Sequence, residues 1–222
     1  ESLPNAILVV CPDSETNKQF ALEVCSTFFC AEKNSCGVCE GCVKTEKLTN
    51  PDLLIFPKEK IFQVADAKEI VETAILSPMI FPQKMYLIND IDTSTIAAQN
   101  KILKVLEEPP QCVKFLITCT NETKVLPTII SRCVKITLCP FEKLRLQNFL
   151  NQQSSTIFDN AYTFGEGYLG KTTFALESNQ FENLNMLADN VIYDLKSSKE
   201  IISLSSKIAK NKDNFLPVSL MI

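Results

Sequence analysis

The chain has 222 residues, of which 45% are hydrophobic and 22% are charged, and its formal net charge is −4. This balance is typical of a globular protein, and the acidic total argues against a broad duplex-DNA-binding face. No run of about 18 apolar residues is present, so we expect no membrane-spanning helix and no membrane partner. No basic-then-apolar leader precedes the first apolar run, so we expect a cytoplasmic protein with reduced cysteines.

Apolar runs alternate with helix-like stretches along the first two thirds of the chain. Five runs are expected to be strands: Ala6–Val10, Leu53–Phe56, Met85–Ile88, Val113–Thr118 and Val134–Leu138. Helical spacing of apolar residues predicts helices at Lys18–Phe29, Val64–Leu76 and Ser94–Leu106. Strands that alternate with helices in this way predict an α/β domain with a doubly wound, parallel, five-stranded sheet.

The pattern of apolar residues changes at Pro140. We assign residues 1–139 to the α/β domain and residues 140–178 to a small helical domain, because only amphipathic stretches and polar turns follow Pro140. Residues 179–222 are expected to begin a further helical domain.

A cluster of cysteines separates the first predicted helix from the second strand. Cys36, Cys39 and Cys42 stand at two-residue gaps, with Cys30 upstream, and Gly37 and Gly41 are expected to supply the freedom for tight turns. Such gaps let successive thiolates turn onto one tetrahedral ion, and four thiolates close the coordination shell. The spacing therefore predicts a structural Zn²⁺ module at about residues 30–42, held by Cys30, Cys36, Cys39 and Cys42.

Three alternatives to this zinc site remain open. Cys25 is a possible replacement for Cys30, although its place in an apolar helix favours a core position. An iron–sulfur cluster is a weaker alternative. Four unliganded cysteines in a surface loop are the third.

Residues 165–172 match the phosphate-loop pattern G-x-x-x-x-G-K-[ST] letter for letter. A working loop needs a strand directly before it and a helix after it, so that backbone amides cradle phosphate at a helix N-terminus. The residues before Gly165 are interrupted by polar side chains and lie in a region predicted to be helical. We therefore expect this match to be coincidental.

The position after the first strand is where a phosphate loop belongs, but Cys11–Gln19 has the wrong residues. The segment contains no glycine, and its carboxylates would repel phosphate. Lys18 stands near the usual lysine position, whereas Gln19 replaces the Ser or Thr that binds magnesium. After the third strand, Asn89-Asp90 replaces the expected pair of acidic residues. We therefore predict a degenerate pocket that does not bind or hydrolyse ATP.

A short turn between the last two predicted strands carries Ser131-Arg132-Cys133, and the preceding helix ends in Leu-Glu107-Glu108-Pro-Pro. An arginine on such a turn tends to point out of its own domain. Its rigid guanidinium fork is suited to pair with phosphate oxygens. The alternative is a surface arginine held in an ordinary ion pair. Adjacent Glu107 and Glu108 face about 100° apart on a helix, so we expect a structural role at the helix end rather than a catalytic carboxylate pair.

These segments together resemble the bacterial replicative clamp loader, specifically the gamma/tau and delta-prime subunits of DNA polymerase III, which are AAA+ P-loop-type proteins with a four-cysteine zinc module. The resemblance covers about Leu3 to Leu138, and more loosely the helical region to Ser178. It identifies residues 140–178 as a lid domain and residues 179–222 as the start of a collar-type domain. It also puts Gly170 at the position of a lid arginine that senses nucleotide.

The resemblance implies a delta-prime-type subunit that hydrolyses no ATP itself. Arg132 would then act in trans as an arginine finger on the ATP of a neighbouring motor subunit. The implied partners are gamma/tau and delta subunits and, through the complex, the sliding clamp and primed DNA.

Two other functions are also compatible with the sequence. The first is an ATP-hydrolysing subunit of the gamma/tau type, which requires nucleotide binding by the isolated chain. The second is a zinc-dependent nucleic-acid-binding protein that uses Lys33, Lys44 and Lys47 around the metal, and the acidic net charge counts against it.

Overall fold

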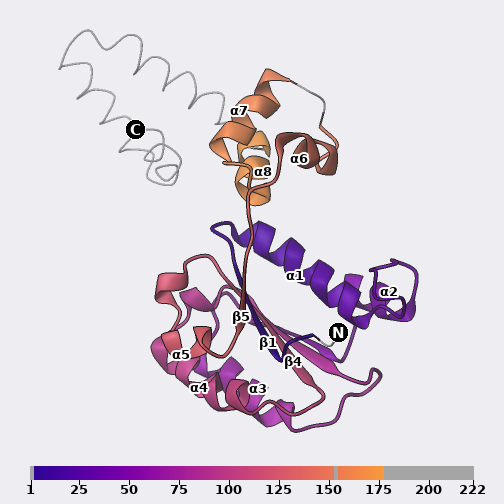
Figure 1. Cartoon of the computed structure of the whole chain (residues 1–222), viewed down its shortest axis with the longest axis vertical. Coiled ribbons are helices and arrows are strands. Elements are labelled where there is room, and N and C mark those ends of the chain that lie inside the picture. Colours follow the sequence, from indigo (N-terminus) through magenta and orange to yellow (C-terminus); the bar gives the residue numbers. More distant parts are fainter. Residues whose placement is uncertain (1–2, 153–154, 178–222) are drawn as a thin grey trace, which may run out of the picture. The chain divides into compact units, whose positions relative to one another are not determined.

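The computed structural model describes residues 3–152 and 155–177 (Figure 1), so the segment expected to begin a collar-type domain lies outside the described residues. The chain divides into two compact units. Among the described residues, one unit contains Leu3–Leu146 together with Gly167–Gly170, and the other contains Gln147–Glu166 and Lys171–Glu177. The domain boundaries at residues 139 and 178 stay predictions. None of the helices in the described part is long and apolar enough to cross a lipid bilayer.

The first unit is built on a five-stranded sheet in which every pair of neighbouring strands is parallel. The strands lie in the order β2-β3-β4-β1-β5. Their bounds are β1 Ala6–Val10, β2 Leu53–Phe56, β3 Lys84–Ile88, β4 Val113–Cys119 and β5 Val134–Thr137. All five strands predicted from the apolar runs are present, and the predicted α/β class with a parallel sheet is confirmed.

Helices cover both faces of this sheet (Figure 1). One layer consists of α1 (Ser14–Phe29) and α2 (Glu40–Glu46), and the other consists of α3 (Val64–Ala74), α4 (Ile96–Glu107) and α5 (Pro127–Ile130). Alternate residues of each strand supply the two cores. In β1, for example, Ile7 and Val9 pack with α1, whereas Leu8 packs with α3 and α4. The continuous apolar runs in the sequence therefore reflect burial on both faces.

Two short 3₁₀ turns complete the first unit: η1 (Ile91–Thr93) and η2 (Glu122–Lys124). The carboxylate of Asp92 accepts hydrogen bonds from the amides of Thr120 and Asn121 at 3.0 and 3.1 Å. It thereby connects the loops that follow β3 and β4. These loops lie at the carboxyl ends of the parallel strands, where ligands bind in this class of fold.

Helix α1 begins earlier than the sequence predicted. Its first residue is Ser14 rather than Lys18, and Asp13 is its N-cap, with a side chain that accepts a hydrogen bond from the Thr16 amide. The polar residues from Ser14 to Asn17 form the first helical turn rather than a loop. Lys18 therefore projects from the helix as an exposed side chain.

The second unit is helical within its described residues. It contains α7 (Thr156–Phe164), and the neighbouring helices α6 (Lys143–Phe149) and α8 (Leu169–Glu177) each begin in the first unit and end in the second. Helix α7, not a strand, precedes the phosphate-loop pattern at residues 165–172, and Gly165 is the C-cap of that helix. The pattern therefore lacks the strand–loop–helix context that a phosphate loop requires.

Candidate functional site

The four predicted metal ligands lie together. The Sγ atoms of Cys30, Cys36, Cys39 and Cys42 all lie within 4.8 Å of one another, and those of Cys36 and Cys42 are 4.0 Å apart. Four thiolates about 2.3 Å from one tetrahedral ion would be separated by about 3.8 Å. The donor set and its spacing therefore fit a metal ion, and structural zinc is compatible with both.

Hydrogen bonds and burial shift the pKa values of two of these thiols in opposite directions. Cys36 donates its amide to the Sγ of Cys30 at 3.5 Å, and this hydrogen bond is the main cause that lowers the pKa of Cys30 to about 5. Burial instead raises the pKa of Cys42 to about 11. A bound cation would favour the thiolate of every ligand, so the buried Cys42 would gain the most from it.

The glycines of the module have different roles from each other. Gly37 has φ +74°, which confirms its predicted role in a tight turn. Gly41 instead lies in α2, where an added Cβ would come within 2.0 Å of the Phe29 carbonyl oxygen. Its absent side chain lets α2 pack directly on the end of α1, which couples the module to the main domain.

Cys25 is a core residue rather than a metal ligand. Its Sγ lies 3.4 Å from the Sδ of Met85, and burial raises its pKa to about 12. This arrangement agrees with the interpretation based on its place in an apolar helix.

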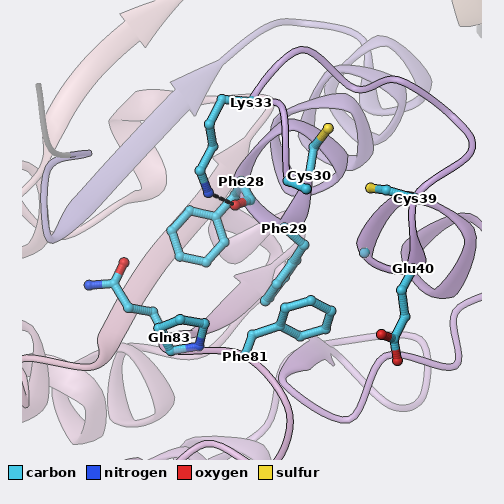
Figure 2. Close-up of a pocket in the computed structure, with 11 residues that line it drawn as sticks. Phe28, Phe29, Cys30, Lys33, Cys39, Glu40, Phe81 and Gln83 are labelled. Carbon is cyan, nitrogen blue, oxygen red and sulfur yellow. Dashed lines mark hydrogen bonds between the residues drawn. The ribbon is translucent and has the colours of Figure 1, made fainter.

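A pocket of about 390 Å³ lies beside the cysteine module (Figure 2). The rings of Phe29 and Phe81 meet at its base with centroids 5.1 Å apart. Its two charged lining residues are already engaged, because Lys33 donates to the Phe28 carbonyl at 2.6 Å and Glu40 pairs with Lys44 at 2.8 Å. Lys33 and Lys44 are therefore not unpaired cations, which weakens the nucleic-acid alternative.

The phosphate-loop position is closed. The early start of α1 leaves only Cys11, Pro12 and Asp13 after β1, and the carboxylate of Asp13 caps the helix. Asp13 is 7% exposed, and its Oδ2 accepts hydrogen bonds from the amides of Thr16 at 2.9 Å and Gly170 at 2.8 Å. A side-chain carboxylate thus occupies the helix N-terminus, where phosphate binds in working loops.

The start of α8 is adapted to this carboxylate. An added Cβ on Gly170 would lie 2.6 Å from Asp13 Oδ1 and 2.6 Å from the Cβ of Glu15. The neighbouring amide of Leu169 donates to Thr16 Oγ1 at 3.1 Å. The position that the resemblance aligned with a lid arginine therefore has room for no side chain.

The remaining polar groups near this position are mainly acceptors. Asn17 is fully buried and donates from Nδ2 to the carbonyls of Cys11 and Cys119 at 3.1 and 3.0 Å. Among the described residues, Asn17 Oδ1, Asn89 Oδ1 and Asp90 Oδ1 are buried without a hydrogen-bond donor. Ser14 already donates its hydroxyl to the other carboxylate oxygen of Asp90. Phosphate needs donors, and oxygen acceptors repel it.

A nearby thiol reports the same electronegative environment. Burial raises the pKa of Cys119 to about 12, and the carboxylates of Asp92, Glu122 and Asp90 act in the same direction. Cys119 ends β4, which places it at the edge of the sheet where Asn89 and Asp90 follow β3.

Arg132 lies between α5 and β5, at the surface of the first unit. Its side chain is 30% exposed. Nη2 donates to Glu107 Oε1 at 3.0 Å, and Nη1 donates to the carbonyl of Thr128 at 2.9 Å. Nε is buried and has no hydrogen-bond partner among the described residues. The guanidinium is therefore held by its own domain while part of it stays accessible.

The sequence patterns did not identify the roles of two acidic residues, one at the start of α1 and one beside Arg132. Asp13 was treated only as a repulsive charge in a loop, although an Asp before Ser-Glu-Thr is a recognisable N-cap signal. Glu107 is expected at the helix end, and it is the last residue of α4. Arg132 does form the ion pair that the alternative interpretation expects, but nothing in the sequence identifies Glu107 as its partner.

A family model described as DNA polymerase III, delta subunit, matches residues 1–142. The chain belongs to this DNA polymerase III delta-subunit family. The delta-subunit family match covers the whole parallel sheet, the cysteine module and Arg132, so all of the candidate sites except the start of α8 lie within it.

Individual relatives agree with this family. The chain is 32% identical to DNA polymerase III subunit tau/gamma of Haemophilus influenzae over 52% of the chain and 17% of that protein. It is 29% identical to the delta-prime subunit of Bacillus subtilis over 60% of the chain and 41% of that protein. A solved gamma-subunit-related protein of Thermotoga maritima has a TM-score of 0.54 at 19% identity, covering 93% of this chain and 73% of that one. The chain thus spans less than half the length of these sequence relatives, and the structural likeness agrees with the α/β fold built on a five-stranded parallel sheet.

Proposed function

We propose that the protein is a delta-prime-type clamp-loader subunit that binds and hydrolyses no ATP. One observation carries this proposal: the carboxylate of Asp13 occupies the start of α1 and receives the amides of Thr16 and Gly170. A nucleotide phosphate would have to displace a buried, hydrogen-bonded carboxylate of its own charge. The family match and the relatives of both tau/gamma and delta-prime kinds support the clamp-loader role.

In this proposal, Arg132 serves as an arginine finger on the ATP of a neighbouring motor subunit. Its partly exposed guanidinium offers charge and an N–H of Nη2 to phosphate oxygens. The partners would be gamma/tau and delta subunits and, through the complex, the sliding clamp and primed DNA, in the cytoplasm.

Replacement of Arg132 by alanine tests the finger in a reconstituted loader. A finger supplied in trans is worth about 10³–10⁵ in rate, so the ATP site that adjoins this subunit should slow by about 10³. Single-turnover phosphate release measures this effect. Arg145→Ala is the matched control, because Arg145 is the only other arginine in the sequence and is 79% exposed on α6. An Arg132→Ala loader with undiminished turnover would remove the finger assignment.

The alternative gamma/tau-type ATPase is tested on the chain by itself. We expect isothermal titration calorimetry with Mg²⁺–ATP to give no binding heat. Tight binding that Lys18→Ala abolishes would establish the alternative instead. Abolition by Lys171→Ala would restore the pattern at residues 165–172 as a phosphate loop.

We also propose that the cysteine module holds a structural zinc ion with Cys30, Cys36, Cys39 and Cys42. Elemental analysis of protein purified without added metal should find about one zinc per chain. Cys42→Ser should lose the metal and lower the melting temperature, whereas Cys139→Ser, at an exposed thiol, should change neither. Iron in place of zinc would favour the cluster alternative, and metal-free stable protein would favour unliganded cysteines.

The zinc-dependent nucleic-acid-binding alternative has a separate test. It requires DNA affinity in the isolated protein that falls steeply with salt concentration, because phosphate contacts release counterions. Fluorescence anisotropy with primed DNA at two salt concentrations measures it, and we expect no specific binding by this chain alone.

A further inference from the structure

We infer that Glu107 is a positioning residue for Arg132, and that their ion pair presents the guanidinium to the neighbouring ATP. This inference rests on the proposed function of Arg132 and adds a second residue to the same site. The pair joins two segments far apart in the sequence, since Nη2 of Arg132 donates to Glu107 Oε1 at 3.0 Å across 25 residues.

Glu107 has a well-fixed backbone from which to hold the guanidinium. It is the last residue of α4, and Glu108 is the C-cap of that helix. The following Pro109 and Pro110 prevent the helix from continuing. The last turn of α4 is anchored by Val105 and Leu106, which are 8% and 4% exposed in the core. The backbone of Glu107 therefore has little freedom to move, and its carboxylate starts from a fixed position.

A second contact holds the other terminal nitrogen. Arg132 Nη1 donates to the carbonyl of Thr128 at 2.9 Å, and the backbone amide of Arg132 donates to the Ile129 carbonyl at 3.0 Å. Carbonyls at the end of a helix carry partial negative charge that favours a cation. With both terminal nitrogens bound, the guanidinium plane has a defined orientation.

This arrangement leaves donors for an incoming phosphate. A guanidinium has five N–H groups, two on each terminal nitrogen and one on Nε. Glu107 accepts one of the two N–H groups of Nη2, so the second remains available. Nε is buried, which confines new partners to the terminal nitrogens. The ion pair thus selects which edge of Arg132 faces outward.

Glu107 has two opposite effects on Arg132: it orients the guanidinium, and it partly neutralises its charge. The orienting effect is the larger one. Glu107 is 58% exposed, so water screens its attraction for Arg132 and the carboxylate reduces the pull on phosphate only weakly. If the Arg132 side chain is already fixed before phosphate arrives, the reaction does not pay the entropy of ordering it. This saving corresponds to about a two- to tenfold increase in rate. Because the ordering gain exceeds the screened loss, removal of the carboxylate should slow the reaction.

The test uses a reconstituted loader that contains Glu107→Gln, which keeps the shape of the side chain and removes its charge. We expect kcat for DNA-stimulated ATP hydrolysis to fall about two- to fivefold at the adjoining site, with KM for ATP unchanged. Glu108→Gln is the matched control and should leave kcat unchanged, because Glu108 is adjacent but has no contact with Arg132 among the described interactions. Glu107→Asp should recover part of the loss.

A double variant separates positioning from a general structural effect. In the Arg132→Ala background, Glu107→Gln should cause no further loss, because its target is already absent. An equal loss in both backgrounds, or an unchanged kcat in Glu107→Gln while Arg132→Ala is slow, would overturn the positioning role and leave the finger in place. Full activity of Arg132→Ala would overturn the proposed function and, with it, this inference.

Discussion

At the start of α1, charged and polar side chains turn toward one another, whereas around Arg132 they support a group that stays accessible. Asp13 is 7% exposed and receives amides from both α1 and the start of α8. Arg132 is 30% exposed and is held by the carboxylate of Glu107 and the carbonyl of Thr128. In the delta-subunit family fold, the first arrangement fills the helix start with a carboxylate, and the second leaves an N–H of Arg132 Nη2 for a ligand.

Under the proposed function, this difference shows how a nucleotide-binding fold could lose its own phosphate site and still supply an arginine to a neighbouring one. A phosphate-binding helix start needs unpaired amides, so a single carboxylate at the N-cap closes it. An arginine finger needs only an accessible guanidinium and a support. Because the two requirements involve different residues, sequence change at one place leaves the other intact.

The largest effect is expected when a substitution at Arg132 is compared with one at the start of α1. Arg132→Lys keeps the charge but loses the planar fork, so the adjoining ATP site should slow by about tenfold to a hundredfold. Lys18→Ala removes a charge from the former loop and should leave turnover unchanged, because Lys18 lies on the exposed surface of α1. Phosphate-release kinetics of the two loaders measure both effects. Equal rates of phosphate release in the two variants would contradict the different roles of Arg132 and the start of α1.

A smaller effect concerns the contact between Asp13 and the start of α8. Gly170→Ala introduces a Cβ 2.6 Å from Asp13 Oδ1, so the free energy of unfolding should fall by about 1–3 kcal/mol. Urea denaturation measures the change. The same substitution should cost less in an Asp13→Ala background, since part of the crowding is then removed. An equal cost in both backgrounds would show that Gly170 and Asp13 are not coupled.

The smallest expected effect is a dependence of stability on pH. Burial raises the pKa of Cys119 to about 12, so the folded protein holds this proton more tightly than the unfolded chain does. The resulting stability is fully present below pH 9 and is lost as pH rises from about 9 toward 12. Between pH 8 and pH 10, Cys119→Ala should lose about 1 kcal/mol less than the unsubstituted protein in urea unfolding. Cys139→Ala, at an exposed thiol, is the control, and equal losses in Cys119→Ala and the unsubstituted protein would contradict the raised pKa of Cys119.

The sequence was sufficient for the elements that depend on local patterns. Apolar runs identified four strands because these strands are largely buried, and residues 53–56 and 85–88 have no polar interruption. The mostly exposed β5 was identified from its alternating apolar residues. The spacing of Cys36, Cys39 and Cys42 located the cysteine cluster because these residues are close along the chain. These signals need no knowledge of the tertiary structure.

Long-range contacts were beyond the reach of these patterns. The hydrogen bond from Gly170 to Asp13 spans 157 residues, and the pair of Arg132 with Glu107 spans 25. The start of α1 was misplaced because Ser14, Glu15 and Thr16 are polar and were interpreted as a loop of the length that a phosphate loop needs. The N-cap preference of Asp13 decided the local structure instead.

The carboxylate of Asp13 differs from a nucleotide in one further respect: it is covalently part of the chain. It cannot dissociate, exchange or be hydrolysed, and its local concentration does not follow the supply of ATP. The hydrogen bonds that join Thr16, Asp13 and Gly170 should therefore persist through every turnover of a neighbouring motor. In a cycle of subunits that gain and lose a ligand, this one would hold the same local geometry throughout.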